Sequence, residues 1–202
     1  MNLITNCCLG AFVYEQLNKE FNNPFMWCAI NTDSFIYLLE HYDKTNFNDV
    51  EFDRYTREDG VRCYSLIIEN NCRLNYTHYL QGGINDHEKI IGKDIYDYRA
   101  YEYCFNKYKT RLARMLENKE PPVFVVLGEL VGKYDYNLEN LKRICEAKTS
   151  HKLLIITSFE ELKQYENDRI KIIIDKHPKN EKGCFTEHYA KLYAETIYNF
   201  LS

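Results

Sequence analysis

The C-terminal half of the chain alternates short apolar runs with amphipathic stretches. The runs read PPVFVVLGEL at residues 121–130, HKLLIIT at 151–157 and IKIIID at 170–175, and helical spacing recurs between them, as in NLENLKRICEA. Continuous apolar runs of strand length are typical of parallel strands that helices cover on both faces. We therefore expect β-α-β-α-β units here, closed by a helix over about 186–201 that begins at Thr186.

The first forty residues predict a short strand and two helices. A strand is expected at residues 3–6, and apolar residues then recur every three to four positions from 10 to 21, which indicates a helix. After a loop that contains a proline, a second helix should begin with Thr32 or Asp33 as its N-cap.

Residues 50–80 contain the clearest β-strand pattern. Three candidate strands lie at 50–52, 61–69 and 72–80, and the Asn70-Asn71 pair between the last two is typical of a turn. We therefore predict an antiparallel hairpin.

A polar loop at 81–93 and a long amphipathic helix over about 97–118 connect the two halves. The chain shows no internal repeat, low-complexity tract or linker. The predicted fold is one α/β domain over residues 1–202. Its mixed sheet has an antiparallel hairpin in the N-terminal half and parallel β-α-β units in the C-terminal half.

Composition excludes several classes of protein. The 26 Lys and Arg against 30 Asp and Glu give a net charge of −4, which argues against non-specific nucleic-acid binding. No apolar run approaches the roughly 18 residues that cross a bilayer, so no membrane span is expected. The opening MNLITNCC lacks the basic and apolar regions of a signal peptide, and we expect a cytoplasmic protein.

The eight cysteines form no C-x-x-C pair and show no zinc-ligand spacing, so we expect no metal, no other cofactor and no disulfide. Most of them lie within apolar patterns, as small buried hydrophobic residues do. They are Cys7, Cys8, Cys28, Cys63, Cys72, Cys104, Cys145 and Cys184.

Cys8 differs from the others because it lies where the first strand runs into the first helix. Backbone N–H groups and the positive end of the helix dipole at such a junction favour the nucleophilic thiolate. Gly10 would leave room for a substrate, and N–H groups near Cys8 and Gly10 would hold an oxyanion. Cys8 is therefore a candidate nucleophile.

A nucleophilic cysteine needs a base, most often a histidine. His78 is the best candidate, because it lies near the end of a predicted strand and next to a polar loop. The alternative is a hydrogen-bonded histidine at a strand end, and His87 is the second choice for the base. His41, His151 and His177 lie in contexts where a solvated histidine is more common than a functional one.

Several acidic or amide side chains are candidates for further roles. Asp94, Asp97, Asn85 and Asp86 could each orient the imidazole, and the sequence does not choose between them. Glu129 follows a predicted parallel strand at the end where α/β sheets bind ligands, although a charge flanking a helix would look the same.

Lys107, Arg111 and Arg114 share one face of the long predicted helix. Such a face could clamp a phosphate or a carboxylate. The alternative is a solvated cationic face, or one that pairs with Glu102 and Glu117.

Four segments of the sequence resemble a known family. They are NCCLGAFVY at the start, NPFMW, THY after the hairpin, and KYKTRLARM in the long helix. This pattern is similar to that of a bacterial family labelled papain-like cysteine peptidases. A sister family of exopolysaccharide-biosynthesis proteins has a related opening and an H-Y pair, and both occur among glycan-assembly genes.

The resemblance implies that Cys8 is the nucleophile and His78 its partner. Met26 departs from the family's P-F-D-W box, where an acidic residue is usual, and Thr110 stands where a second arginine is usual. The first departure puts any role for that acid in doubt. The resemblance assigns substrate binding to Gly10, Tyr14, Trp27, Lys107, Arg111 and Arg114.

Three functional hypotheses follow. The first is a cysteine-dependent hydrolase or acyl transferase with a papain-like Cys8–His78 dyad, acting on a small-molecule, peptide or glycan substrate in surface-polysaccharide metabolism. The second is a glycan-pathway protein that binds a nucleotide-sugar or sugar-phosphate without thiol chemistry. The third is a module with no enzymatic activity. The sequence does not predict an oligomeric state.

Overall fold

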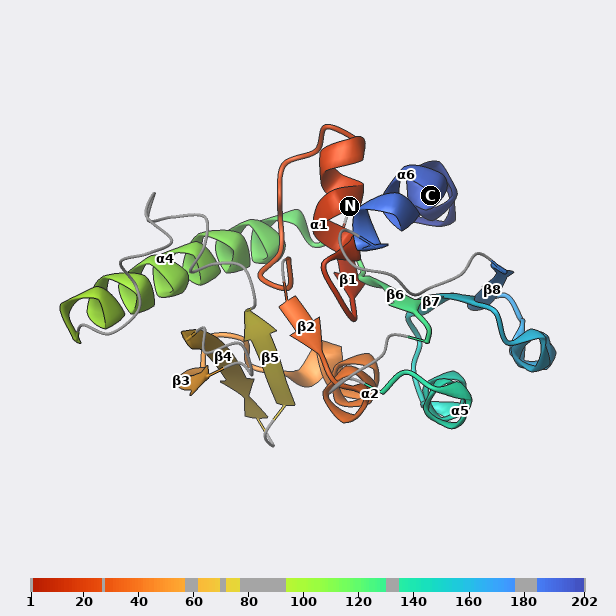
Figure 1. Ribbon diagram of the computed structural model, residues 1–202, viewed down its shortest axis with the longest axis horizontal. Coiled ribbons are helices and arrows are strands. Elements are labelled where there is room, and N and C mark those ends of the chain that lie inside the picture. The colour runs from red at the N-terminus through yellow and green to blue at the C-terminus, as the bar shows by residue number, and fades with distance from the viewer. Residues whose placement is uncertain are drawn as a thin grey trace.

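The computed structural model describes residues 2–26, 28–56, 62–69, 72–76, 94–129, 135–176 and 185–201. In these residues the protein is an α/β structure whose strands form two four-stranded sheets, one parallel and one antiparallel (Figure 1). The α/β class with parallel units in the C-terminal half and an antiparallel hairpin in the N-terminal half is confirmed.

The parallel sheet has the order β1-β6-β7-β8. Its strands are β1 (Leu3–Thr5), β6 (Val123–Leu127), β7 (Lys152–Thr157) and β8 (Ile170–Ile174). All residues of β1 and β6 are buried, as the continuous apolar runs predict for strands covered on both faces. The N-terminal strand joins this sheet by pairing Leu3 with Val123.

Helices cover both faces of the parallel sheet (Figure 1). On one face, α1 (Leu9–Gln16) packs against α6 (Phe185–Leu201), and on the other α2 (Thr32–His41) packs against α5 (Leu138–Glu146). Phe35 of α2 meets Phe124 of β6 edge-on, with ring centroids 5.6 Å apart.

Short 3₁₀ helices occur at η1 (Tyr42–Lys44) and at η3 (Glu160–Tyr165). The prediction of an α-helix between β7 and β8 is wrong, because η3 makes this connection. Leu162 is the buried residue of η3, so the segment offers too little apolar surface to hold a longer helix against the sheet.

The antiparallel sheet has the order β2-β5-β4-β3. Its strands are β2 (Cys28–Ile30), β3 (Glu51–Thr56), β4 (Arg62–Ile68) and β5 (Cys72–Tyr76). The predicted antiparallel pairing is confirmed by the register, in which Ile68 lies opposite Cys72. The proposed turn residues Asn70 and Asn71 lie outside the described residues.

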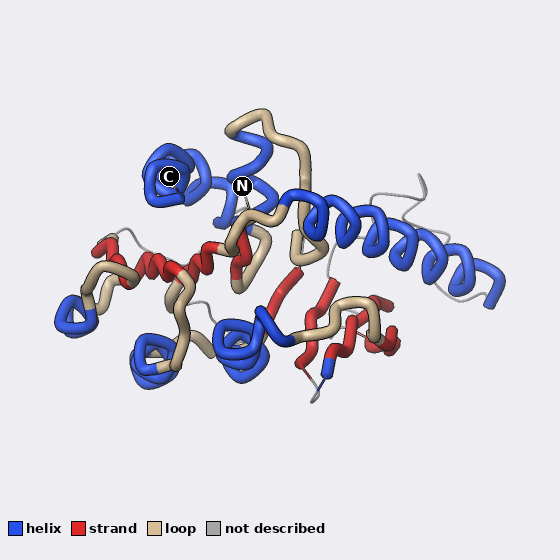
Figure 2. Tube along the Cα trace, turned by 180° about the vertical axis from the view of Figure 1, so that it is seen from behind, coloured by secondary structure: helices blue, strands red, loops and turns tan. Residues whose placement is uncertain are grey.

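The long helix α4 (Asp94–Asn118) lies beside the antiparallel sheet and extends beyond it (Figure 2). It begins three residues before the predicted start. Leu112 of α4, Leu74 of β5 and Phe124 of β6 belong to one buried cluster, so the two sheets share a hydrophobic core.

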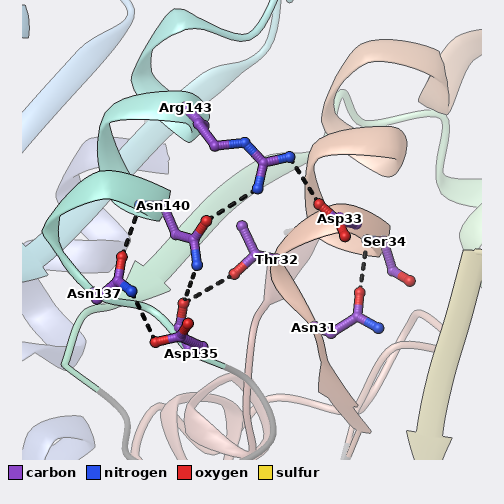
Figure 3. Close-up of polar contacts among 8 residues, drawn as sticks. All are labelled: Asn31, Thr32, Asp33, Ser34, Asp135, Asn137, Asn140 and Arg143. Atoms are coloured by element: carbon purple, nitrogen blue, oxygen red, sulfur yellow. Dashed lines mark hydrogen bonds and ion pairs between the residues drawn. The ribbon is translucent and has the colours of Figure 1, made fainter.

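Asparagines cap α2 and α5, and a polar network joins the two helix starts (Figure 3). The Asn31 side chain accepts the N–H of Ser34 at 2.8 Å, so the cap precedes both predicted candidates, Thr32 and Asp33. The Asp135 carbonyl accepts bonds from Thr32 and from Asn140.

An ion pair completes the contact between these helices: Arg143 of α5 meets Asp33 of α2 at 2.8 Å. The network fixes the starts of α2 and α5 next to each other, where α5 follows β6 at the carboxyl edge of the parallel sheet. In α6, by contrast, Thr186 lies inside the helix, which begins at Phe185.

Candidate active site

The turn from β1 into α1 is fixed by one threonine. Thr5 Oγ1 donates to the carbonyl of Cys7 at 2.6 Å and accepts the N–H of Gly10 at 3.1 Å. Thr5 is buried, so both bonds are shielded from water. They hold the chain in the tight bend that places Cys8 at the start of the helix.

Cys8 is the N-cap residue of α1, and its side chain is half-buried. Among the cysteines whose burial the structure describes, the other four are buried: Cys7, Cys28, Cys72 and Cys145. Burial raises the pKa of the Cys7 thiol strongly, and that of Cys72 and Cys145 to about 12. Of these five thiols, Cys8 alone combines access to solvent with a helix N-terminus.

Asn6 anchors the end of β1 from both sides. Its side-chain nitrogen donates to the Leu127 carbonyl at 2.9 Å, and its side-chain oxygen accepts the Leu127 N–H at 3.0 Å. Its own carbonyl accepts the N–H of Ile30 at 3.0 Å, which links β1 to β2. The residue two positions before Cys8 therefore ties the end of β1 to β6 in the same sheet and to β2 in the antiparallel sheet.

Polar side chains gather where the neighbouring parallel strands end. Glu129 follows β6 with φ of 55°, a left-handed conformation that non-glycine residues seldom adopt. Its Oε1 accepts the N–H of Ser158, just after β7, at 2.8 Å, and also the Ser158 hydroxyl. Glu129 therefore lies at the predicted edge of the sheet, and its side chain links two strand ends.

Asp175 follows β8 and is only 2% exposed. Its carboxylate interacts electrostatically with the phenol groups of Tyr189 and Tyr193, both on α6. Burial is the main cause that raises the pKa of both phenols, that of Tyr193 to about 12, and the Asp175 carboxylate adds to it. Sequence reasoning missed Asp175, although its position directly after an apolar run was the available signal.

His78, His87 and Trp27 lie outside the described residues, so the Cys8–His78 pairing stays a prediction. The side chains of Asp94 and Asp97 and the residues Asn85 and Asp86 are outside them too. The strand β5 that precedes His78 ends at Tyr76, which lies opposite Cys28.

The arginines of α4 hold the loop between α1 and β2. Arg111 is 7% exposed, donates to the Met26 carbonyl at 3.4 Å and lies 5.0 Å from the Phe21 ring centroid. Arg114 donates to the Phe21 carbonyl at 3.0 Å and pairs with Glu20 at 2.6 Å. These contacts give both residues a structural role, and their role in substrate binding stays a prediction.

The two other described candidates for substrate binding differ in exposure. Tyr14 is 1% exposed and its hydroxyl bonds to Asn22, while burial strongly raises its pKa. It packs among the buried residues of α1 and α6. Lys107 is half-buried on α4.

His151 corrects one interpretation of the sequence. Its position at the start of a strand favours a solvated histidine, but its side chain is 9% exposed and lies 3.3 Å from the Asp43 carboxylate. Tyr42 and Phe124 bury the imidazole, which the local sequence does not reveal. His41, by contrast, is exposed.

A family model described as a domain of unknown function (DUF1919) matches residues 1–194. The chain belongs to the DUF1919 family. The match includes all strands of both sheets and the turn that carries Cys8. No curated protein matches the chain.

The described residues of this DUF1919 member include neither a metal cluster nor a membrane-spanning helix. Within the described residues, no cluster of three or more His, Cys, Asp or Glu side chains is placed to hold a metal ion. Over the same residues, no helix has the length and apolar character to cross a membrane.

We predict that Gly10→Ala destabilises this DUF1919 protein by about 1–2 kcal/mol, since overpacking outweighs the helix propensity of alanine. An added Cβ would lie 2.9 Å from Thr5 Oγ1, and Thr5 cannot rotate away without breaking two buried hydrogen bonds. Urea unfolding measures the change.

The control for this prediction is the same substitution in a Thr5→Ala background, where the clash is absent and Gly10→Ala should be neutral or stabilising. A stabilising Gly10→Ala in the wild-type background would contradict the packing described here.

Proposed function

We propose that the protein is a cysteine-dependent hydrolase or acyl transferase with Cys8 as its nucleophile. The observation that carries the proposal is the position of Cys8: a half-buried thiol at the N-terminus of α1, at the carboxyl end of a parallel strand. Helix N-termini favour thiolates, and α/β sheets bind their ligands at this edge.

The proposed base is His78. The described structure supports this choice through the path of β5, which ends at Tyr76 opposite Cys28. Two residues before Cys28, the Met26 side chain lies 3.6 Å from the position of a Cβ on Gly10. The strand that precedes His78 therefore ends next to a segment that packs against the first turn of α1.

In the proposed reaction, the Cys8 thiolate attacks the carbonyl carbon of an ester or amide. A carbon–sulfur bond forms, and the leaving alcohol or amine departs with a proton from His78. Water, or an acceptor hydroxyl, then attacks the thioester, gives its proton to His78 and releases Cys8. Backbone N–H groups at the start of α1 would hold the oxyanion, and that of Gly10 would have to exchange its bond to Thr5.

The substrate class rests on the sequence resemblance. The families that the sequence resembles are encoded among glycan-assembly genes, so an acylated surface polysaccharide is the first substrate to test. Small-molecule esters and peptides are further candidates.

The test is to trap the acyl-enzyme with p-nitrophenyl acetate, quench it in acid and map the acetyl group by peptide mass spectrometry. The proposal predicts one acetyl group, carried by the peptide that contains Cys8 and lost over time by hydrolysis. Acetyl groups that accumulate on surface lysines instead, or none at all, would show that Cys8 is not a nucleophile. The carboxyl edge with Glu129 and Asp175 would then be tested for ligand binding without thiol chemistry.

A further inference from the structure

A hollow lies at the amino edge of the parallel sheet, opposite the edge that carries Cys8. It has a volume of about 850 Å³, and its lining includes Val123 and Lys152, the first residues of β6 and β7. Small-molecule sites commonly have volumes of about 300–1,000 Å³. Since Cys8 lies at the carboxyl edge, this pocket is separate from the proposed active site and does not depend on it.

The wall on the α1–α6 side of this pocket is cationic. Lys19, just after α1, has its ammonium 5.9 Å from the ring centroid of Tyr198 on α6. The ammonium of Lys152 donates to the Phe200 carbonyl at 3.0 Å and lies 5.5 Å from the Phe200 ring. An ammonium has three N–H donors. The Phe200 carbonyl accepts one of those of Lys152 and so holds the ammonium in place.

The wall on the α2 side is anionic. Asp43, in η1, faces the imidazole of His151, whose Nε2 lies 3.3 Å from Asp43 Oδ2. The ring of Tyr42 packs against that imidazole with centroids 5.6 Å apart, and the backbone N–H of His151 donates to Thr149 Oγ1 at 3.1 Å. Glu120, between α4 and β6, adds a second carboxylate to the lining.

The net charge of this wall depends on the protonation state of the buried His151 imidazole. Burial lowers the pKa of His151, although the nearby Asp43 carboxylate opposes the shift. The neutral form therefore dominates at neutral pH, and it does not cancel the charge of Asp43. The lining then carries Lys19 and Lys152 on the α1–α6 side and the Asp43 carboxylate on the α2 side, and Glu120 adds a second carboxylate.

We propose that this pocket binds a zwitterionic small molecule of the amino-acid or short-peptide class. The carboxylate of the ligand meets Lys19 and Lys152, and its ammonium meets Asp43 and Glu120. The apolar surface of Pro121, Pro122 and the Tyr198 ring receives the side chain of the ligand.

The separation of charge favours this class over the alternatives. A purely anionic ligand would bring its charge close to two carboxylates, and a purely cationic one would face two lysines. An apolar ligand would remove four charged groups from water without pairing them, which is costly. A zwitterion pairs its carboxylate with the lysines and its ammonium with the carboxylates at the same time.

The test uses the full chain, screened by thermal shift and titration calorimetry against the twenty L-amino acids and a set of dipeptides. The best ligand is then compared with its N-acetylated and C-amidated forms. We expect at least one zwitterion to bind, and each blocked form to bind at least tenfold more weakly. Failure of the whole panel to bind, or equal binding of a blocked form, would overturn the proposal.

Two substitutions locate the binding. Lys19→Gln and Asp43→Asn should each weaken the best ligand at least tenfold. The matched controls, Lys171→Gln on β8 and Asp168→Asn in the loop before it, are exposed, lie outside the pocket and should leave affinity within twofold. Equal loss in the control variants, or no loss in the pocket variants, would place the ligand elsewhere and refute the assignment.

Discussion

Turnover of an acyl probe should fall by about 10³-fold or more when Cys8 is replaced with serine. A serine hydroxyl is far less acidic than a thiol, so it does not supply the anionic nucleophile on which the proposed attack depends. The rate is followed as release of p-nitrophenol. Cys8 is half-buried at the N-cap and has no side-chain capping bond, so the free energy of unfolding should change by less than about 1 kcal/mol.

Cys72→Ala is the control for this prediction. Cys72 is buried in the antiparallel sheet, so its replacement should lower stability but leave the rate per folded molecule unchanged. A Cys8→Ser protein that keeps the wild-type rate would rule out Cys8 as the nucleophile, whatever its stability.

The second large effect is on stability. Asn6→Ala should lower the free energy of unfolding by about 2–4 kcal/mol, because it leaves both the N–H and the carbonyl of Leu127 buried without these bonds. Asn6 has no exposed surface and Leu127 none either, so water cannot replace the lost partner without a rearrangement. Denaturant unfolding measures the loss.

Asn118→Ala is the matched control. Asn118 also bonds through its side chain, to Glu120 at 3.2 Å, but it is exposed and should cost less than about 0.5 kcal/mol. If Asn6→Ala proved as mild as this control, the side chain of Asn6 would not be what ties β1 to β6.

Local patterns predicted the elements whose cause is local. The apolar runs became β6 and β7, because a strand covered on both faces needs apolar residues, and the third run became the edge strand β8, whose Lys171 is exposed. Cys8 could be placed at a strand–helix junction for the same reason, since both elements are specified within a few residues of it.

Contacts between distant residues could not be predicted in this way. The pairing of Leu3 with Val123 joins residues 120 positions apart, and no local feature of either segment indicates its partner. The same holds for the burial of His151 against Tyr42, and for Arg111, whose buried bond to Met26 depends on how α4 crosses the chain. The helix cap at Asn31 was missed by one residue, because Asn, Thr and Asp are all favoured caps.

The most direct test of the central claim is the rate of iodoacetamide labelling at each cysteine between pH 5 and 9, read by peptide mass spectrometry. Cys72 and Cys145, whose thiols have a pKa of about 12, should label negligibly throughout and serve as internal references. The account predicts that Cys8 labels rapidly below pH 7 and loses this advantage in His78→Ala. Labelling of Cys8 that is as slow as the references, or that His78→Ala leaves unchanged, would contradict the proposed dyad.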